Sequence, residues 1–78
     1  MTETEFKQEA ATARPKLVSI ALRYLKNSDE AEDIVQDAML RLWQIHARLN
    51  LPLMPIASVI TRNIAIDRLR HAMPHTAI

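Results

Sequence analysis

The chain has 78 residues, no cysteine, no glycine and a formal net charge of +1. The lack of cysteine excludes disulfides and thiolate metal sites, and the balanced charge gives no overall sign of a nucleic-acid partner. A domain of this length buries only about 60% of its unfolded surface, so residues 1–78 are expected to form one domain with one small core.

The composition favours an all-α fold, which we expect to be a compact bundle of three helices. Sheet proteins need glycine turns and alternating β-branched or aromatic residues, and this chain has one phenylalanine, one tyrosine and one tryptophan. The first helix is expected over about residues 4–26, with Pro15 either kinking it or splitting it in two. Four of its residues recur at helical spacing and should face the core: Leu17, Ala21, Tyr24 and Leu25.

The second helix is expected over about residues 29–49. Asn27 and Ser28 end the first helix and supply an N-cap, and the carboxylates that follow suit the positive end of the helix dipole. We expect Trp43, the single tryptophan, to lie in the core. The predicted buried stripe contains Ala31, Ile34, Val35, Ala38, Leu42, Ile45 and Leu49. The opposite, exposed side contains Asp33, Gln36, Asp37, Leu40, Arg41 and Gln44.

The third helix is expected over residues 55–72, after an apolar loop that contains two prolines. Pro55 suits the first helical position, whose N–H has no partner in any helix. Pro74 bars further helix, and residues 75–78 are expected to form a frayed end. Apolar residues occupy much of the helix circumference, so this helix is either buried on several sides or presents an apolar working surface.

Charge is distributed unevenly along the second and third helices. Residues 29–37 hold five carboxylates and no basic residue, whereas residues 62–70 hold three arginines and one aspartate. An acidic and a basic surface on one small domain suggest two different partners. The alternative is that both are ordinary solvated helix faces.

Catalysis is not indicated, and we expect neither an enzyme nor a cofactor or metal. Asp33 and Asp37 lie one turn apart on an exposed face, and no glycine loop could cradle phosphate. The three histidines lack the spacing of a metal site. The longest uncharged stretch, residues 49–61, is too short to span a bilayer, and no signal peptide is apparent. We therefore expect a cytoplasmic protein with no membrane partner.

Two blocks carry a resemblance to a known family. Residues 31–43 read AEDIVQDAMLRLW and residues 62–70 read RNIAIDRLR. In this order they resemble region 2 of bacterial RNA polymerase sigma factors of the extracytoplasmic-function type, which carry A-E-D-[LI]-V-Q-[ED]-x-[FM]-L-R-[LA]-W and R-N-x-A-[LI]-D-x-L-R. The resemblance covers about residues 15–71. It implies a transcription initiation factor domain that docks on core RNA polymerase and contacts the melted promoter −10 element.

The resemblance implies a docking role for the acidic helix. In the family this ridge docks on the clamp helices of the polymerase β′ subunit, and Asp33, Gln36 and Asp37 match its positions. Leu40 and Arg41 continue the ridge. A carboxylate–amide–carboxylate patch also suits a partner helix rich in arginine, because guanidinium groups match carboxylates. The alternative is that these carboxylates only stabilise the helix dipole and keep the domain soluble. We prefer this alternative for residues 29 and 30.

The resemblance implies DNA contact for the basic helix. Arg62 and Asn63 match the family's R-N pair, Arg68 and Arg70 could bind phosphates, and residues 50–54 would be the base-capturing loop. Asp67 is expected to be structural, tied to the first helix by an ion pair with Arg23.

The chain departs from the family pattern before the basic helix. Leu53, Ile56 and Ser58 replace the usual aromatics, and the loop is about two residues shorter. A second reading is therefore an interaction module that docks on polymerase or an anti-sigma protein without opening DNA. A helix-turn-helix DNA binder is a third reading, which the long double-proline loop disfavours. Nothing matches region 4, the −35-binding domain of these sigma factors.

Overall fold

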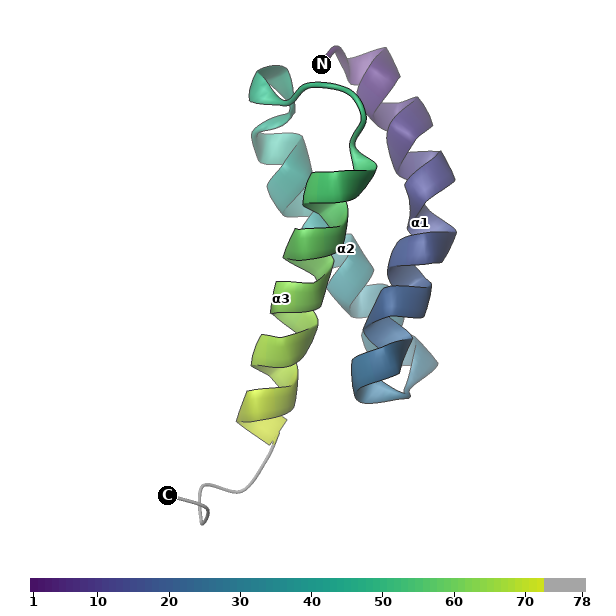
Figure 1. The fold of residues 1–78 in the computed structure, drawn as a ribbon, viewed down its shortest axis with the longest axis vertical. Helices are drawn as coiled ribbons and strands as arrows, with labels where there is room; N and C mark the ends of the chain where they lie inside the picture. The colour runs from purple at the N-terminus through teal and green to yellow at the C-terminus, as the bar shows by residue number, and fades with distance from the viewer. Residues whose placement is uncertain (73–78) are drawn as a thin grey trace.

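The structure is a computed structural model that describes residues 1–72. It contains three α-helices, α1 (Glu3–Leu25), α2 (Ser28–Gln44) and α3 (Met54–Ala72), and a 3₁₀ turn, η1 (His46–Arg48). The helices lie side by side, and the α2–α3 connection sits beside the start of α1, at the opposite end from the α1–α2 turn (Figure 1). The predicted all-α bundle of three helices is confirmed over the described residues; the predicted frayed end lies outside them.

Helix α1 is one uninterrupted helix that contains Pro15, so the predicted split does not occur. A capping box starts it: the Thr2 hydroxyl accepts from the Glu5 N–H at 3.1 Å, and the Glu5 carboxylate accepts from the Thr2 N–H at 2.8 Å. Lys26 ends it in the left-handed conformation, with φ 56°, and its N–H donates to Leu22. Only Lys26 and Asn27 separate α1 from α2, so the two helices run antiparallel as neighbours.

Helix α2 begins as predicted but ends at Gln44, earlier than residue 49. The Asn27 side chain accepts from the Glu30 N–H at 3.0 Å, which confirms the N-cap. After Gln44 the backbone tightens into η1, where the Leu49 N–H donates to His46 three residues back. The prediction that Ile45 and Leu49 are buried was therefore wrong: Ile45 is 37% exposed and Leu49 is half-buried.

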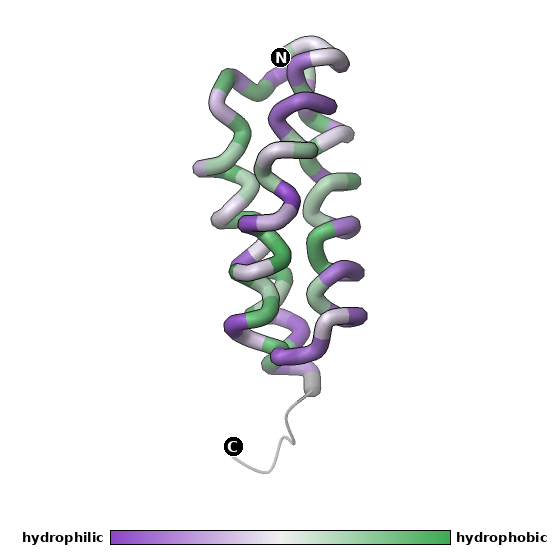
Figure 2. Tube along the Cα trace, turned by 90° about the vertical axis from the view of Figure 1, so that its right-hand side faces the viewer, coloured by the Kyte–Doolittle hydropathy of each residue, from purple (hydrophilic) through white to green (hydrophobic). Residues whose placement is uncertain are grey.

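The core lies between the inner faces of the three helices, and many of its members are alanines that let the helices approach closely. Hydrophobic and hydrophilic segments alternate along each helix (Figure 2), as expected of helices with one buried face. The predicted core positions Tyr24 and Leu25 are only half-buried. The buried residues include Phe6, Ala13, Leu17, Ala21, Ala31, Ile34, Val35, Ala38, Leu42, Leu53, Ala57, Ile64 and Ala65.

Trp43 does not lie in the core, and that prediction was wrong. Its side chain is 38% exposed, because Trp43 follows the buried Leu42 at the border of the inner face of α2. The indole stacks on His46 with ring centroids 4.1 Å apart, and Phe6 packs against the indole in a T-shaped arrangement with centroids 5.4 Å apart. Phe6 is the buried aromatic residue at this end of the bundle.

Helix α1 and the residues before it hold the α2–α3 connection in place. The Glu9 carboxylate accepts from the Leu53 N–H at 2.8 Å, and the Met1 backbone nitrogen donates to the carbonyl oxygens of His46 and Leu49. The Leu53 carbonyl in turn accepts from the Ala57 N–H at 3.0 Å. Helix α3 therefore begins at Met54, one residue before the expected start at Pro55. None of the three described helices has the length and hydropathy of a membrane span.

Candidate functional site

The exposed side of α2 forms a continuous ridge, which we call the α2 ridge: Asp33, Gln36, Asp37, Leu40 and Arg41. The spacing of i, i+3, i+4, i+7 and i+8 puts these side chains on one face. All are exposed except the half-buried Asp37, and Leu40 is 57% exposed. Arg41 donates to both carboxylate oxygens of Asp37, at 3.1 and 3.4 Å, so this carboxylate already holds one guanidinium. The predicted exposure is confirmed for the other four residues of the α2 ridge, but not for Asp37.

Three of the four predicted DNA-contact residues lie together on the outward face of α3. Arg62, Asn63 and Arg70 are exposed, and they share this face with Val59 and Ile66 at helical spacing. Val59 is 46% exposed. The apolar pattern of this helix left open whether it is buried or presents an apolar surface. Helix α3 does both, because it buries one face and presents apolar side chains among cations on the other.

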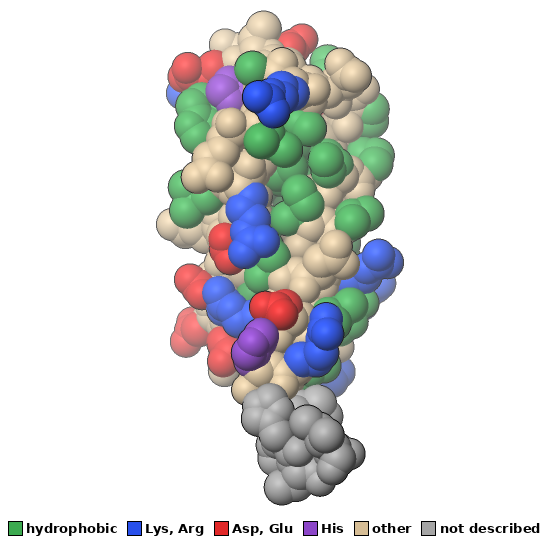
Figure 3. Space-filling model, turned by 90° about the vertical axis from the view of Figure 1, so that its left-hand side faces the viewer, with side chains coloured by type: hydrophobic (Ala, Val, Ile, Leu, Met, Phe, Trp, Pro, Cys, Tyr) green, Lys and Arg blue, Asp and Glu red, His purple; other side chains and the backbone are tan. Residues whose placement is uncertain are grey.

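Arg68 does not join them. Its guanidinium points to α2 and lies 2.8 Å from the carboxylate of Asp33, with the two side chains 36% and 66% exposed. This ion pair connects the α2 ridge directly to the basic helix. The acidic and basic surfaces are consequently neighbours on the α2–α3 side of the bundle, where charges of both signs are interspersed (Figure 3).

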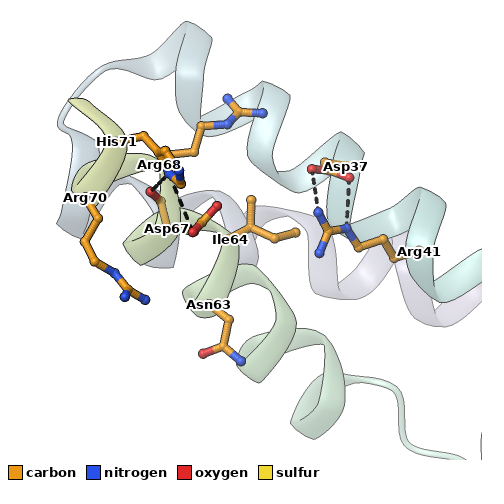
Figure 4. A pocket seen from close by; sticks show the side chains of 8 residues that line it. All are labelled: Asp37, Arg41, Asn63, Ile64, Asp67, Arg68, Arg70 and His71. Carbon is orange, nitrogen blue, oxygen red and sulfur yellow. Dashed lines mark hydrogen bonds and ion pairs between the residues drawn. The ribbon is translucent and has the colours of Figure 1, made fainter.

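A groove of about 490 Å³ lies between α2 and α3 (Figure 4). Carboxylates and guanidinium groups both line it, so its field is mixed rather than strongly cationic. The lining residues are Asp37, Arg41, Asn63, Ile64, Asp67, Arg68, Arg70 and His71.

The predicted ion pair between Asp67 and Arg23 was wrong. Asp67 lies in the α2–α3 groove, one turn after Asn63, with its carboxylate 3.6 Å from Nδ1 of His71 (Figure 4). Arg23 belongs to α1 and lines a separate cavity between α1 and α3. Because the Asp67 and His71 side chains are 63% and 75% exposed, this contact adds little to stability.

The loop and the start of α3 lack the aromatic side chains of the resembled family. Leu53 is buried in the core, Ile56 is half-buried, and the Ser58 hydroxyl donates to the Met54 carbonyl at 2.8 Å. Leu51 is 51% exposed in the loop. The predicted base-capturing loop thus presents aliphatic rather than aromatic surface. No cluster of acidic and histidine side chains in residues 1–72 could hold a metal ion.

Sequence reasoning missed a second cavity, between α1 and α3, of about 270 Å³. Its walls include Arg23 and Arg62, and neither arginine forms an ion pair within residues 1–72. The sequence does show that neither has a carboxylate three or four residues away. Their proximity, however, depends on how α1 packs against α3. The other lining residues are Ile20, Tyr24, Ser58 and Val59.

The chain is similar in sequence to known proteins. Over 56 residues, which are 69% of this chain, it is 43% identical to a probable RNA polymerase sigma factor, RfaY, of Xanthomonas campestris pv. campestris. Over 81 aligned residues, covering all of this chain, it is 36% identical to an uncharacterized protein of Rhizobium meliloti (strain 1021). The chain spans only 14% and 19% of the lengths of these two relatives.

No solved structure gives a significant match to the chain. Residues 10–73 match the family described as Sigma-70 region 2, and this segment contains both the α2 ridge and the outward face of α3. The chain therefore belongs to the sigma-70 region 2 family.

Proposed function

We propose that this domain is the part of a transcription initiation factor that docks on core RNA polymerase through the α2 ridge. The observation that carries this proposal is Leu40, a large apolar side chain 57% exposed among the polar residues of the ridge. An exposed leucine on a ridge that also carries Asp33 and Asp37 suits a partner helix that offers arginines around an apolar groove. The β′ clamp helices are the partner that the family implies. Such a factor binds rather than catalyses, and it acts in the cytoplasm.

The outward face of α3 would contact the melted −10 strand. Arg62 and Arg70 can neutralise phosphates, and Asn63 between them carries both a donor and an acceptor for a base edge. The two faces lie on adjacent helices, so polymerase docking would hold α3 beside the opened promoter. A domain of net charge +1 needs such help, because electrostatic attraction alone would give weak binding.

The second candidate is a module that docks on polymerase or an anti-sigma protein without opening DNA. Two observations favour it: Arg68 is held by Asp33, and aliphatic side chains stand where the family has aromatics. Base–aromatic stacking contributes about 1–3 kcal/mol per base in single-strand binders, so its loss at Leu53 and Ile56 matters.

Capture of core polymerase by the chain and by Gln36→Lys tests the docking proposal. A lysine at this exposed central position would face the partner's cations, and like-charge contacts cost several kcal/mol, so at least a tenfold loss of binding is expected. Gln8→Lys, an equally charged change on the exposed side of α1, is the matched control and should bind as wild type. Equal binding by both variants, with unchanged melting, would reject the α2 ridge as the docking surface.

A further inference from the structure

The cavity between α1 and α3 is lined by cations without any carboxylate, unlike the groove between α2 and α3. Arg23 and Arg62 enter it from two different helices, and no aspartate or glutamate lines it. In the α2–α3 groove, by contrast, Asp37 and Asp67 also line the walls, and two of the three arginines, Arg41 and Arg68, are bound to Asp37 and Asp33. An anion that approaches the α1–α3 cavity therefore meets two guanidinium groups that no carboxylate of residues 1–72 neutralises.

The same cavity also has apolar walls. Ile20 and Tyr24 contribute from α1, and Val59 contributes from α3 with 46% of its side chain exposed. Tyr24 lines the cavity and is only half-buried, so a ligand in the cavity can contact it. The occupant should thus combine anionic groups with a flat apolar surface. At about 270 Å³ the cavity is slightly smaller than pockets for drug-sized ligands, which begin at about 300 Å³, so it suits one small unit.

We propose that Arg23, Tyr24 and Arg62 form a binding site for one nucleotide of a single-stranded nucleic acid. Unstacked bases expose flat apolar faces beside phosphates, whereas a duplex hides those faces in its stack. Arg62 belongs both to this site and to the outward face of α3, so the site extends that face onto α1. Tyr24 provides the aromatic surface that Leu53, Ile56 and Ser58 do not. The inference rests on the proposed function, since it names further residues that hold the strand.

Photocrosslinking locates the strand directly. The 78-residue chain is irradiated with an oligothymidylate carrying 5-bromodeoxyuridine, and the attachment site is mapped by peptide mass spectrometry. Attachment at Tyr24 is expected, because the halogenated base should lie against its ring. Attachment only at Trp43 or in the loop, or no binding of single strands even at low salt, would overturn the proposal.

Salt-dependent binding tests the arginines. Arg23→Gln should weaken oligothymidylate binding and make the log–log salt slope less negative by about 0.7, the value for one phosphate on a single strand. Lys16→Gln, another cation removed from the exposed side of α1, should leave both quantities unchanged. Tyr24→Leu should weaken binding about fivefold or more, whereas Tyr24→Phe, which keeps the ring, should retain it.

The outcome separates this inference from the proposed function. If Arg23→Gln and Tyr24→Leu bind as wild type while Asn63→Ala still alters promoter binding in the polymerase complex, only the cavity proposal fails. If Gln36→Lys retains polymerase and Asn63→Ala changes nothing, the proposed function fails. In that case a crosslink at Tyr24 would still establish the cavity as a nucleotide site.

Discussion

The guanidinium of Arg68 lies 2.8 Å from the carboxylate of Asp33, and this pair joins α3 to the α2 ridge. An arginine from a docking partner would compete with Arg68 for the same carboxylate. Both side chains are substantially exposed, so the pair contributes at most about 1 kcal/mol and is easily exchanged.

Arg68→Ala should therefore lower the free energy of unfolding by less than about 1 kcal/mol, and the effect should shrink in high salt. Urea denaturation at low and high ionic strength measures it. Arg70→Ala, an exposed arginine in the same last turns of α3, is the control and should have no such salt-dependent effect. A loss above about 2 kcal/mol would mean that Arg68 does more than pair with Asp33.

Thr61→Val should stabilise the domain. Thr61 is fully buried, and its hydroxyl has no hydrogen-bond partner within residues 1–72. A buried unsatisfied polar group costs about 1–3 kcal/mol, and valine has nearly the same shape without that group. We expect a rise in Tm of several degrees by circular dichroism, since about 1 kcal/mol corresponds to about 4–8 °C in so small a domain. Thr12→Val, which removes an exposed hydroxyl bonded to the Gln8 carbonyl, should not raise Tm.

Glu9→Ala should loosen the α2–α3 connection. The Glu9 carboxylate accepts from the part-buried Leu53 N–H at 2.8 Å, and hydrogen bonds to charged groups contribute about 1.5–3 kcal/mol. Hydrogen exchange at the Leu53 amide should accelerate, as NMR would show. Glu9→Gln keeps an acceptor oxygen and should keep most of the protection. Unchanged exchange in Glu9→Ala would show that the connection is held by other contacts.

DNA binding should be weak in the isolated domain and stronger in the polymerase complex. If α3 neutralises two or three phosphates, the log–log salt slope on single strands should lie between about −1.4 and −2.1. Asn63→Ala should reduce discrimination among −10-like sequences, whereas Arg70→Ala should weaken all of them alike. Fluorescence anisotropy over a salt series, with and without core polymerase, measures these effects. Absence of binding even in the complex would favour the docking-only module.

Local features of the fold were predictable from the sequence because local signals specify them. The apolar spacing predicts the inner face of α2 up to Leu42, and Asn27 supplies the N-cap that its side chain suggests. The end of α2 was not predictable, because Ile45 and Leu49 continue the helical spacing through η1. The contacts that hold η1 come from distant residues, including the Met1 backbone nitrogen.

The candidate site was predictable only in part. Periodicity identifies the exposed side of α2, but the predicted DNA-contact set of α3 included Arg68, which lies apart from Arg62, Asn63 and Arg70. Periodicity cannot tell how neighbouring helices are rotated against each other. That rotation brings Arg68 to Asp33 and places Arg23 in a different cavity from Asp67.

The turn at Lys26 has a consequence for how much change this domain can tolerate. An L-residue in the left-handed conformation costs about 1–2 kcal/mol, and glycine, which is favoured at such helix ends, is absent from the chain. Lys26 therefore holds strain in the turn between α1 and α2, and it belongs neither to the α2 ridge nor to the outward face of α3. Removing this strain would raise the free energy of unfolding. The domain could then tolerate destabilising substitutions on its binding faces, which a small domain near its stability threshold otherwise cannot.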